Sequence, residues 1–287
     1  MSVYVGLDIG GTKWMAAVAD RQGSILRRAL RPAIHALEAG LAALNEMVTE
    51  VADGQPVLAI GAAAGGPLDW QTGLVSPLHQ PAWRAVPLRQ IMEERWGCPF
   101  YVDVDTNLAA LAEYTYGGAK VSRLLYLTLS TGMGGGFLID GRIYRGAGGA
   151  HPEVAHQSVP YRCAHPAGLA CECGLPDCLE ALVSGNGIRR VYGKPAEHLS
   201  PAEWAEVAYN LGQGLRNLAA IYTPDLIRIG GGVALGGGPV FVEQARQVMA
   251  AHLRLVPAPQ VSLSRLGPDT ALRGALLLAS RGRAALE

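Results

Sequence analysis

The sequence predicts an α/β protein that is built from two lobes. Strand-like apolar segments alternate with segments of helical hydrophobic spacing along most of the 287 residues. A strand that ends in a glycine turn and returns as a second strand occurs near Gly10 and again near Gly132, which suggests two related lobes. Hydrophobic residues make up 49% of the chain, so a sizeable buried core is available.

We expect the first half of the chain to form the N-terminal lobe, which covers residues 1–117. Period-two alternation and β-branched residues predict its strands, and apolar residues at helical spacing predict its helices. The expected elements, in order, are strands at 3–9, 14–18 and 25–31 with a turn at 20–23 between the last two, a helix at 34–51, a strand at 57–60, a helix at 86–96, a strand at 100–104 and a helix at 105–116.

The second half, residues 118–269, should form the C-terminal lobe, and a terminal helix at 270–287 should return to complete the first lobe. The same signals predict its elements. In order, they are a strand at 124–129, a glycine loop at 130–136, a strand at 137–139, a hairpin turn at 140–141, a helix from 179, a helix at 201–222, a strand at 226–229, a helix at 240–255, a strand near 261 and the terminal helix from 270.

Charge and composition exclude several classes of protein. The chain has 24 basic and 24 acidic residues, whereas a nucleic-acid binder usually shows a basic excess. The first residues lack the basic and apolar segments of a secretory signal, and no apolar run approaches the length of about 18 residues that a membrane span needs. We therefore expect a cytoplasmic protein with neither nucleic acid nor membrane as a partner.

Three of the five cysteines fall within eight residues, in the stretch CECGLPDC. In a cytoplasmic chain such clustering indicates a metal more often than a disulfide. A structural zinc site takes four Cys or His ligands, and the candidate set is His156, Cys171, Cys173 and Cys178. Cys163 and His165 compete for a ligand position. Three ordinary thiols near a loop are the alternative.

Three apolar strands end in glycines, at Gly10–Gly11, Gly132–Gly136 and Gly230–Gly232. Glycine allows backbone N–H groups to approach an anion without a Cβ atom in the way. One such loop could serve a hairpin alone, but three of them favour a shared phosphate ligand. None of the three matches the P-loop or the dinucleotide-binding pattern. Hydroxyl and ammonium donors, or else solvated turn residues, stand beside the loops at Thr12, Lys13 and Thr131.

Two aspartates are candidates for chemistry. Asp105 stands where a strand ends and a helix begins, so it is either a helix N-cap or a side chain that points into a cleft. Thr106 could cap the helix instead. Asp8 lies within the first apolar strand, where an unpaired carboxylate is unfavourable and a contact with Mg²⁺ is plausible.

Five motifs together resemble the ROK family of sugar kinases and sugar-responsive repressors. They occur in the family's order over nearly the whole chain, and the cysteine motif with its upstream Glu-x-x-His is specific to the family. The motifs are GLDIGGTK at 6–13, DTNLAALAE at 105–113, STGMGGG at 130–136, HPEVAH at 151–156 and CECG…CLE at 171–180.

The resemblance implies an actin-like, RNase H-like fold with ATP and a sugar in a cleft between the lobes. It implies that Asp105 is the general base, and that Glu153, His156 and Glu180 reach the sugar, with His156 also binding structural Zn²⁺ through its other nitrogen. We add Gly65 and Asn107 to the sugar site. The residues assigned to ATP and Mg²⁺ are Asp8, Gly10, Gly11, Thr12, Lys13, Thr131, Gly132, Gly134, Gly231 and Gly232.

The expected activity is ATP-dependent phosphorylation of a hexose, at the 6-hydroxyl of glucose, fructose or mannose. One alternative is an N-acetylhexosamine kinase. The other is a non-catalytic sugar-binding protein, and Asp105 and the three glycine loops count against this second alternative. Repressors of the family carry a DNA-binding domain before the first glycine loop, and here that loop follows Met1 within ten residues, so we expect none. We expect a homodimer or homotetramer.

The sequence departs from the family pattern at two positions. Pro152 replaces the usual glycine before Glu153, as in the fructokinase-like branch. Val104 replaces the asparagine that precedes the catalytic aspartate in the glucose and N-acetylhexosamine kinases. Since valine offers no hydrogen bond, the identity of the sugar stays open.

Overall fold

The computed structural model describes residues 2–20 and 23–285, which divide into two compact units. Unit 1 comprises residues 1–112, 147–149 and 269–287, and unit 2 comprises residues 113–146 and 150–268. Each unit has its own sheet and its own hydrophobic core. The predicted turn at 20–23 and the end of the predicted terminal helix lie partly outside the described residues.

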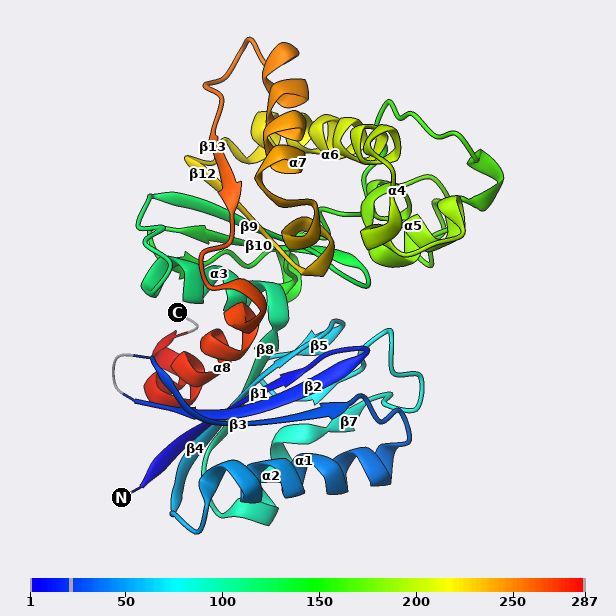
Figure 1. Cartoon of the computed structure of the whole chain (residues 1–287). Helices are drawn as coiled ribbons and strands as arrows, with labels where there is room; N and C mark the ends of the chain where they lie inside the picture. The colour runs from blue at the N-terminus through cyan, green and yellow to red at the C-terminus, as the bar shows by residue number, and fades with distance from the viewer. Residues whose placement is uncertain (1, 21–22, 286–287) are drawn as a thin grey trace. The chain divides into compact units, whose positions relative to one another are not determined.

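Unit 1 is built on a five-stranded sheet with the order β3-β2-β1-β4-β8 (Figure 1). Its strands are β1 (Val3–Ile9), β2 (Lys13–Ala19), β3 (Ile25–Pro32), β4 (Val57–Ala64) and β8 (Phe100–Val104). The first three strands form an antiparallel meander, and β4 and β8 continue the sheet in parallel with β1. The expected strands of the first lobe are all present.

Two helices cover opposite faces of this sheet, α1 (Leu37–Ala52) and α8 (Thr270–Arg281). Because side chains alternate along a strand, Val5 and Leu7 of β1 join the core beneath α1, while Gly6 between them faces α8. A Cβ atom on Gly6 would lie 2.7 Å from Leu276, and one on Gly61 would lie 2.1 Å from a backbone oxygen of α8. These glycines allow the helix to pack closely.

The remaining elements of unit 1 are short. They are the small sheet of β5 (Leu68–Asp69), β6 (Leu74–Val75) and β7 (Val86–Pro87), followed by α2 (Leu88–Trp96). Helix α3 (Asp105–Thr115) begins directly at the end of β8 and runs from unit 1 into unit 2. Single 3-10 turns occupy Ala147–Gly149, Pro166–Gly168, Ala196–His198, Gly267–Asp269 and Gly282–Ala285.

The sheet of unit 2 has the same plan, with the order β11-β10-β9-β12-β13. Its strands are β9 (Arg123–Leu129), β10 (Met133–Ile139), β11 (Arg142–Ile143), β12 (Leu226–Gly230) and β13 (Gln260–Leu263). An antiparallel meander is again followed by two parallel strands. The hairpin turn at Asp140–Gly141, both with positive φ, is the one that the sequence predicts.

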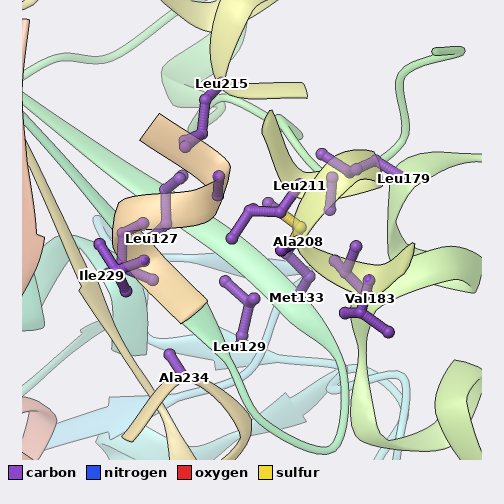
Figure 2. Packing of buried hydrophobic residues seen from close by; sticks show 14 of the residues in the cluster. Leu127, Leu129, Met133, Leu179, Val183, Ala208, Leu211, Leu215, Ile229 and Ala234 are labelled. Carbon is purple, nitrogen blue, oxygen red and sulfur yellow. The ribbon is translucent and has the colours of Figure 1, made fainter. Parts of the chain in front are cut away.

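Helices pack against this second sheet and form the larger core. They are α4 (Leu179–Val183), α5 (Gly185–Tyr192), α6 (Pro201–Tyr222) and α7 (Gly232–Ala251). Ser200 and Glu203 form a capping box that begins α6. Figure 2 shows Leu127 of β9 in one cluster with Leu211 of α6 and Ile229 of β12.

Three sequence predictions about unit 2 need correction. Strand β10 begins at Met133, four residues before the predicted start, because its glycines pair in the sheet instead of forming a loop. Helix α7 begins at Gly232 and kinks at Gly238, whose φ is 69°. The predicted helix from Leu179 breaks at Ser184, which ends α4 and caps α5.

Two predictions about unit 1 also shift. Helix α1 begins at Leu37, so Ile34 precedes it, and Val86–Pro87 forms a strand before α2.

Among the described helices, none has the combination of length and apolar character that crossing a membrane would require.

Candidate functional site

One edge of the sheet in unit 1 collects several candidate residues. The parallel strands β1, β4 and β8 end in register, since Ile9 pairs with Ala64 and Ala64 pairs with Val104. The residues that follow these ends are Gly10, Gly65 and Asp105. Ligands of open α/β sheets bind at the carboxyl ends of parallel strands, so this edge is the candidate site of unit 1.

Hydrogen bonds from two side chains hold the backbone of the first glycine loop (Gly10–Thr12) in place. The Gly10 carbonyl oxygen accepts hydrogen bonds from Trp14 Nε1 at 3.0 Å and from Gln80 Nε2 at 3.3 Å. Because a trans peptide places C=O and the next N–H on opposite sides, the Gly11 N–H is directed away from these two donors. A Cβ atom on Gly11 would lie 3.0 Å from the His79 Cβ, a tight contact that a larger residue would have to relieve by a small shift of His79.

Thr12 follows in the same turn and Lys13 begins β2, and both residues are exposed. The Thr12 carbonyl accepts a hydrogen bond from Ala33 N at 3.0 Å, which fixes the turn to the end of β3. Outward N–H groups, a hydroxyl and an ammonium group together suit an anion such as a phosphate.

Asp105 is the first residue of α3 and is partly buried. Its Oδ1 accepts a hydrogen bond from Thr106 N at 2.7 Å. Two residues earlier, the buried Asp103 accepts hydrogen bonds from Val104 N at 2.6 Å and from Asn107 Nδ2 at 3.0 Å. Asp103 therefore stabilises the junction between strand and helix from the inside.

Asn107, which we assigned to the sugar, has no solvent exposure. Its amide nitrogen serves Asp103, while its buried oxygen has no hydrogen-bond partner among the described residues. Gly65 is partly buried at the end of β4, and a Cβ atom there would have Pro77 at 3.8 Å. Val104 is 5% exposed. A ligand can therefore approach the backbone of Gly65, whereas the Asn107 side chain has no exposed surface for a ligand to contact.

Asp8 lies in β1 on the same edge and has an unusual acidity. The pKa of its carboxyl group is raised to about 7, mainly by burial and next by the Asp105 carboxylate, while Lys13 acts in the opposite direction. A carboxyl group with such a pKa ionises readily when a cation arrives. Oxygen donors of this kind are those that Mg²⁺ prefers.

Unit 2 contains the cysteine cluster. The ligand atoms of His156, Cys171, Cys173 and Cys178 all lie within 4.8 Å of one another. A tetrahedral zinc site with Zn–S bonds of about 2.3 Å has edges of about 3.8 Å, so the donor set and its spacing fit zinc. Cys163 and His165 are not members of this group. Cys163 packs instead against the core of unit 2.

The two ring nitrogens of His156 face different partners. Nδ1 lies 3.6 Å from Cys171 Sγ and 3.8 Å from Cys178 Sγ, so this nitrogen belongs to the cysteine cluster. Nε2 lies 3.7 Å from a carboxylate oxygen of the exposed Glu153. His151, which the sequence did not single out, lies 3.4 Å from the other oxygen of Glu153.

Glu180, the second residue of α4, makes two contacts that the sequence did not predict. Its Oε2 accepts a hydrogen bond from the backbone N–H of Met133 at 2.9 Å. Its Oε1 lies 3.5 Å from Cys171 Sγ. The carboxylate therefore joins the start of β10 to the cysteine cluster.

The second glycine loop (Ser130–Gly132) and the turn at Gly231 follow the neighbouring parallel strands β9 and β12. Gly231 has a φ of 88°, and a Cβ atom there would lie 2.2 Å from the Leu129 carbonyl oxygen. Gly232 begins α7, so the helix N-terminus opens at this edge. Gly134, which we assigned to phosphate, lies within β10 opposite Thr128.

Comparison with known proteins gives a consistent result. Residues 4–282 match the sequence profile of a family described as the ROK family. A glucokinase of Streptomyces coelicolor is 31% identical over 97% of this chain and 98% of its own length. A fructokinase of Zymomonas mobilis is 32% identical over 80% of each chain. The crystal structure of a ROK family glucokinase from Streptomyces griseus in complex with glucose and AMPPNP has a TM-score of 0.83 and 29% identity, and covers 98% of this chain and 100% of its own.

Proposed function

The chain belongs to the ROK family and is a sugar kinase, and from this premise we propose that it transfers the terminal phosphoryl group of ATP to the 6-hydroxyl of a hexose. Glucose, fructose and mannose are the first candidates for the acceptor. Relatives named glucokinase and fructokinase support this choice, as does the similar glucokinase that holds glucose and an ATP analogue.

The observation that carries the proposal is the shared edge of β1, β4 and β8. It brings the first glycine loop and Asp105 to the same side of one sheet. Phosphoryl transfer depends on positioning and charge neutralisation more than on covalent chemistry. In this proposal Asp105 accepts the proton of the sugar's 6-hydroxyl group. The oxygen of that hydroxyl bonds to the terminal phosphorus of ATP, the bond from this phosphorus to ADP breaks, and ADP leaves.

We assign the nucleotide to the glycine loops. The backbone N–H of Gly11, the Lys13 ammonium group and the N-terminus of α7 at Gly232 would bind phosphate oxygens. Asp8 would hold Mg²⁺, directly or through water, and the ion would neutralise phosphate charge when bound. The adjustable ionisation of Asp8 supports this role.

We assign the sugar to Gly65 in unit 1 and to Glu153, His156 and Glu180 in unit 2. Carboxylates accept hydrogen bonds from sugar hydroxyls, and Glu153 is largely exposed. His156 can donate or accept at Nε2 while Nδ1 faces the cysteines. The assignment keeps Asn107 as a support of Asp103, because its side chain is buried.

We propose that the cysteine cluster holds a structural zinc ion. Three thiolates and one imidazole would supply the four ligands that a structural zinc ion takes, which would leave no open position for catalysis. The ion would fix the loop that carries His156 and the start of α4 that carries Glu180. Its effect on the reaction would therefore pass through the positions of these two side chains.

The test is a sugar panel in a coupled assay of ADP release, with ATP and Mg²⁺. Glucose, fructose and mannose should include at least one acceptor with turnover well above the rate of ATP hydrolysis without sugar. N-acetylglucosamine and N-acetylmannosamine test the alternative of an N-acetylhexosamine kinase. If no sugar in the panel stimulates ADP release, the proposed hexose kinase is wrong.

A further inference from the structure

The Glu180 carboxylate connects two regions of unit 2 that the proposed reaction uses separately. Its Oε2 accepts the Met133 N–H at 2.9 Å, directly after the second glycine loop. Its Oε1 faces the cysteine cluster through Cys171 at 3.5 Å. Its own backbone N–H donates to the Ala155 carbonyl at 3.0 Å, next to His156. One residue thus contacts the first residue after the proposed phosphate loop and the proposed sugar loop.

The segment after Glu180 fastens the same glycine loop a second time. Gly185 N donates to the Ser130 carbonyl at 2.7 Å, and Asn186 N donates to the Thr131 carbonyl at 3.0 Å. Ser184 holds the start of α5 by accepting a hydrogen bond from Gly187 N at 3.0 Å. Residues 180–186 therefore make three hydrogen bonds to residues 130–133, which connect the loop's backbone to α4 and α5.

We propose that Glu180 couples the two substrates, so that sugar binding at its carboxylate tightens nucleotide binding at the second glycine loop. This inference rests on the proposed function, since it needs the sugar at Glu180 and a phosphate group at the loop. Glu180 is then a positioning residue for the nucleotide as well as a ligand of the sugar.

The physical reason is shared ordering. A carboxylate can accept several hydrogen bonds, so a sugar hydroxyl can bind Glu180 without displacing the Met133 N–H. A bound sugar restricts the rotamers of Glu180, and the restricted carboxylate restricts the loop. The nucleotide that arrives afterwards loses less conformational entropy, which strengthens its binding. Thermodynamic linkage requires the nucleotide to strengthen sugar binding by the same factor.

The test is isothermal titration with ADP, in the presence and in the absence of the sugar that the panel identifies. ADP lacks the phosphoryl group that would meet the sugar hydroxyl, so coupling through direct contact of the substrates is avoided. The wild-type protein should bind ADP roughly fivefold or more tightly when the sugar is saturating, which is the usual size of such coupling.

Two variants interrupt the connection in different ways. Glu180→Asp keeps the charge but shortens the side chain, so that it cannot reach both the Met133 N–H and the sugar. Gly185→Ala places a methyl group 2.9 Å from the Ser130 carbonyl oxygen without changing a residue assigned to the sugar. In each variant the ratio of ADP affinities with and without sugar should fall below about twofold. Asn186→Ala is the matched control, since it keeps the backbone N–H that donates a hydrogen bond to the Thr131 carbonyl oxygen.

Two outcomes contradict the inference. The first is equal ADP affinity with and without sugar in the wild-type protein. The second is that Glu180→Asp and Gly185→Ala, each confirmed as folded by its melting temperature, both keep the wild-type ratio of ADP affinities with and without sugar. If a sugar supports turnover but shows no coupling, only this inference fails. If no sugar binds or reacts, the proposed function fails with it.

Discussion

Asp8 and Asp105 are the two carboxyl residues to which we assign the chemistry at the edge of unit 1. One sheet positions both carboxyl groups, since Asp8 is a residue of β1 and Asp105 follows the end of β8. The sequence identified both through their motifs. It could not give the acidity of Asp8, because that depends on burial and on the neighbouring Asp105 and Lys13.

The first prediction concerns pH and Asp8. Its pKa is raised to about 7 in the folded protein, above the ordinary value of about 3.9 in an unfolded chain. The folded state therefore binds more protons between these values, and stability falls as pH rises from about 4 through about 7. Asp8→Asn removes this penalty. In nucleotide-free protein, the melting temperature of the variant should exceed that of the wild type at pH 8.5, and the difference should shrink toward pH 4.5. A difference that does not change with pH would show that Asp8 has an ordinary pKa.

The second prediction concerns Val104, which is 5% exposed beside Asp105. If a glucose hydroxyl lies against this side chain, it lacks a partner there, at a cost of about 1–3 kcal/mol or a factor of about 5 to 150 in binding. The wild-type protein should therefore have a high KM for glucose, or it should prefer fructose or mannose, with a KM for that sugar lower than the KM for glucose. Val104→Asn should lower the KM for glucose, measured next to fructose in the same assay. A low wild-type KM for glucose that the substitution leaves unchanged would show that Val104 does not face the sugar.

At the scale of elements, periodicity predicted most strands and helices but failed where glycine is frequent. Gly134, Gly135 and Gly136 have no side chains to show alternation, although they pair with β9 as a regular strand. Gly135 is required there because a Cβ atom would lie 2.6 Å from Val154, a contact that is distant in sequence. The start of α7 was missed for the same reason.

The same limit applies to the candidate site. Ligand spacing predicted which four residues would lie together as possible metal ligands, because thiols and imidazoles are visible in the sequence. The hydrogen bond from Met133 to Glu180 was not predictable, since a backbone donor can belong to any residue. The fastening of Gly10 by Gln80 was missed too, because seventy residues separate them.

The third prediction concerns the loop that the cysteine cluster holds. Purified protein should contain about one zinc ion per chain by elemental analysis, as four ligands imply. Cys171→Ser should lower both the melting temperature and the affinity for the sugar, because His156 and Glu180 lose a common support. Cys98→Ser, outside the cluster, is the control and should leave the zinc content and the affinity for the sugar unchanged. Metal-free protein with full activity and stability would contradict the prediction.

The fourth prediction concerns the end of α3. Glu113 is fully buried there, and its Oε1 accepts hydrogen bonds from Ser264 Oγ at 2.5 Å and from Arg265 N at 3.0 Å. Its Oε2 lies 3.5 Å from the buried Arg228 Nε. Glu113→Gln leaves the Arg228 charge without its counter-ion, which should reduce the free energy of unfolding by about 3–5 kcal/mol.

Denaturant unfolding measures this loss, and Glu197→Gln on an exposed turn is the matched control. Adding Arg228→Met to the Glu113→Gln variant should recover part of the stability, because it removes the unpaired charge. If the single variant unfolds like the control, the pair does not stabilise the end of α3.

At the scale of the whole molecule, the actin-like fold that the family resemblance implies is confirmed by the likeness to the Streptomyces griseus glucokinase over 98% of the chain. Each unit has a meander followed by two parallel strands, and each presents a glycine loop after its first strand. The repeated plan explains why the glycine pattern occurs twice in the sequence. The division at residues 117 and 269 and the expected homodimer or homotetramer stay predictions.

The central claim is that a sugar kinase of this plan uses Asp105 as its base, and the most direct measurement is the turnover of Asp105→Asn with the best sugar of the panel. The amide keeps the size of the side chain but cannot accept the hydroxyl proton. We predict a kcat reduced by about 10²–10⁴-fold, with an unchanged melting temperature and with ADP binding retained. A folded variant that keeps more than about a tenth of the wild-type kcat would contradict the assignment, since loss of a general base costs far more than this.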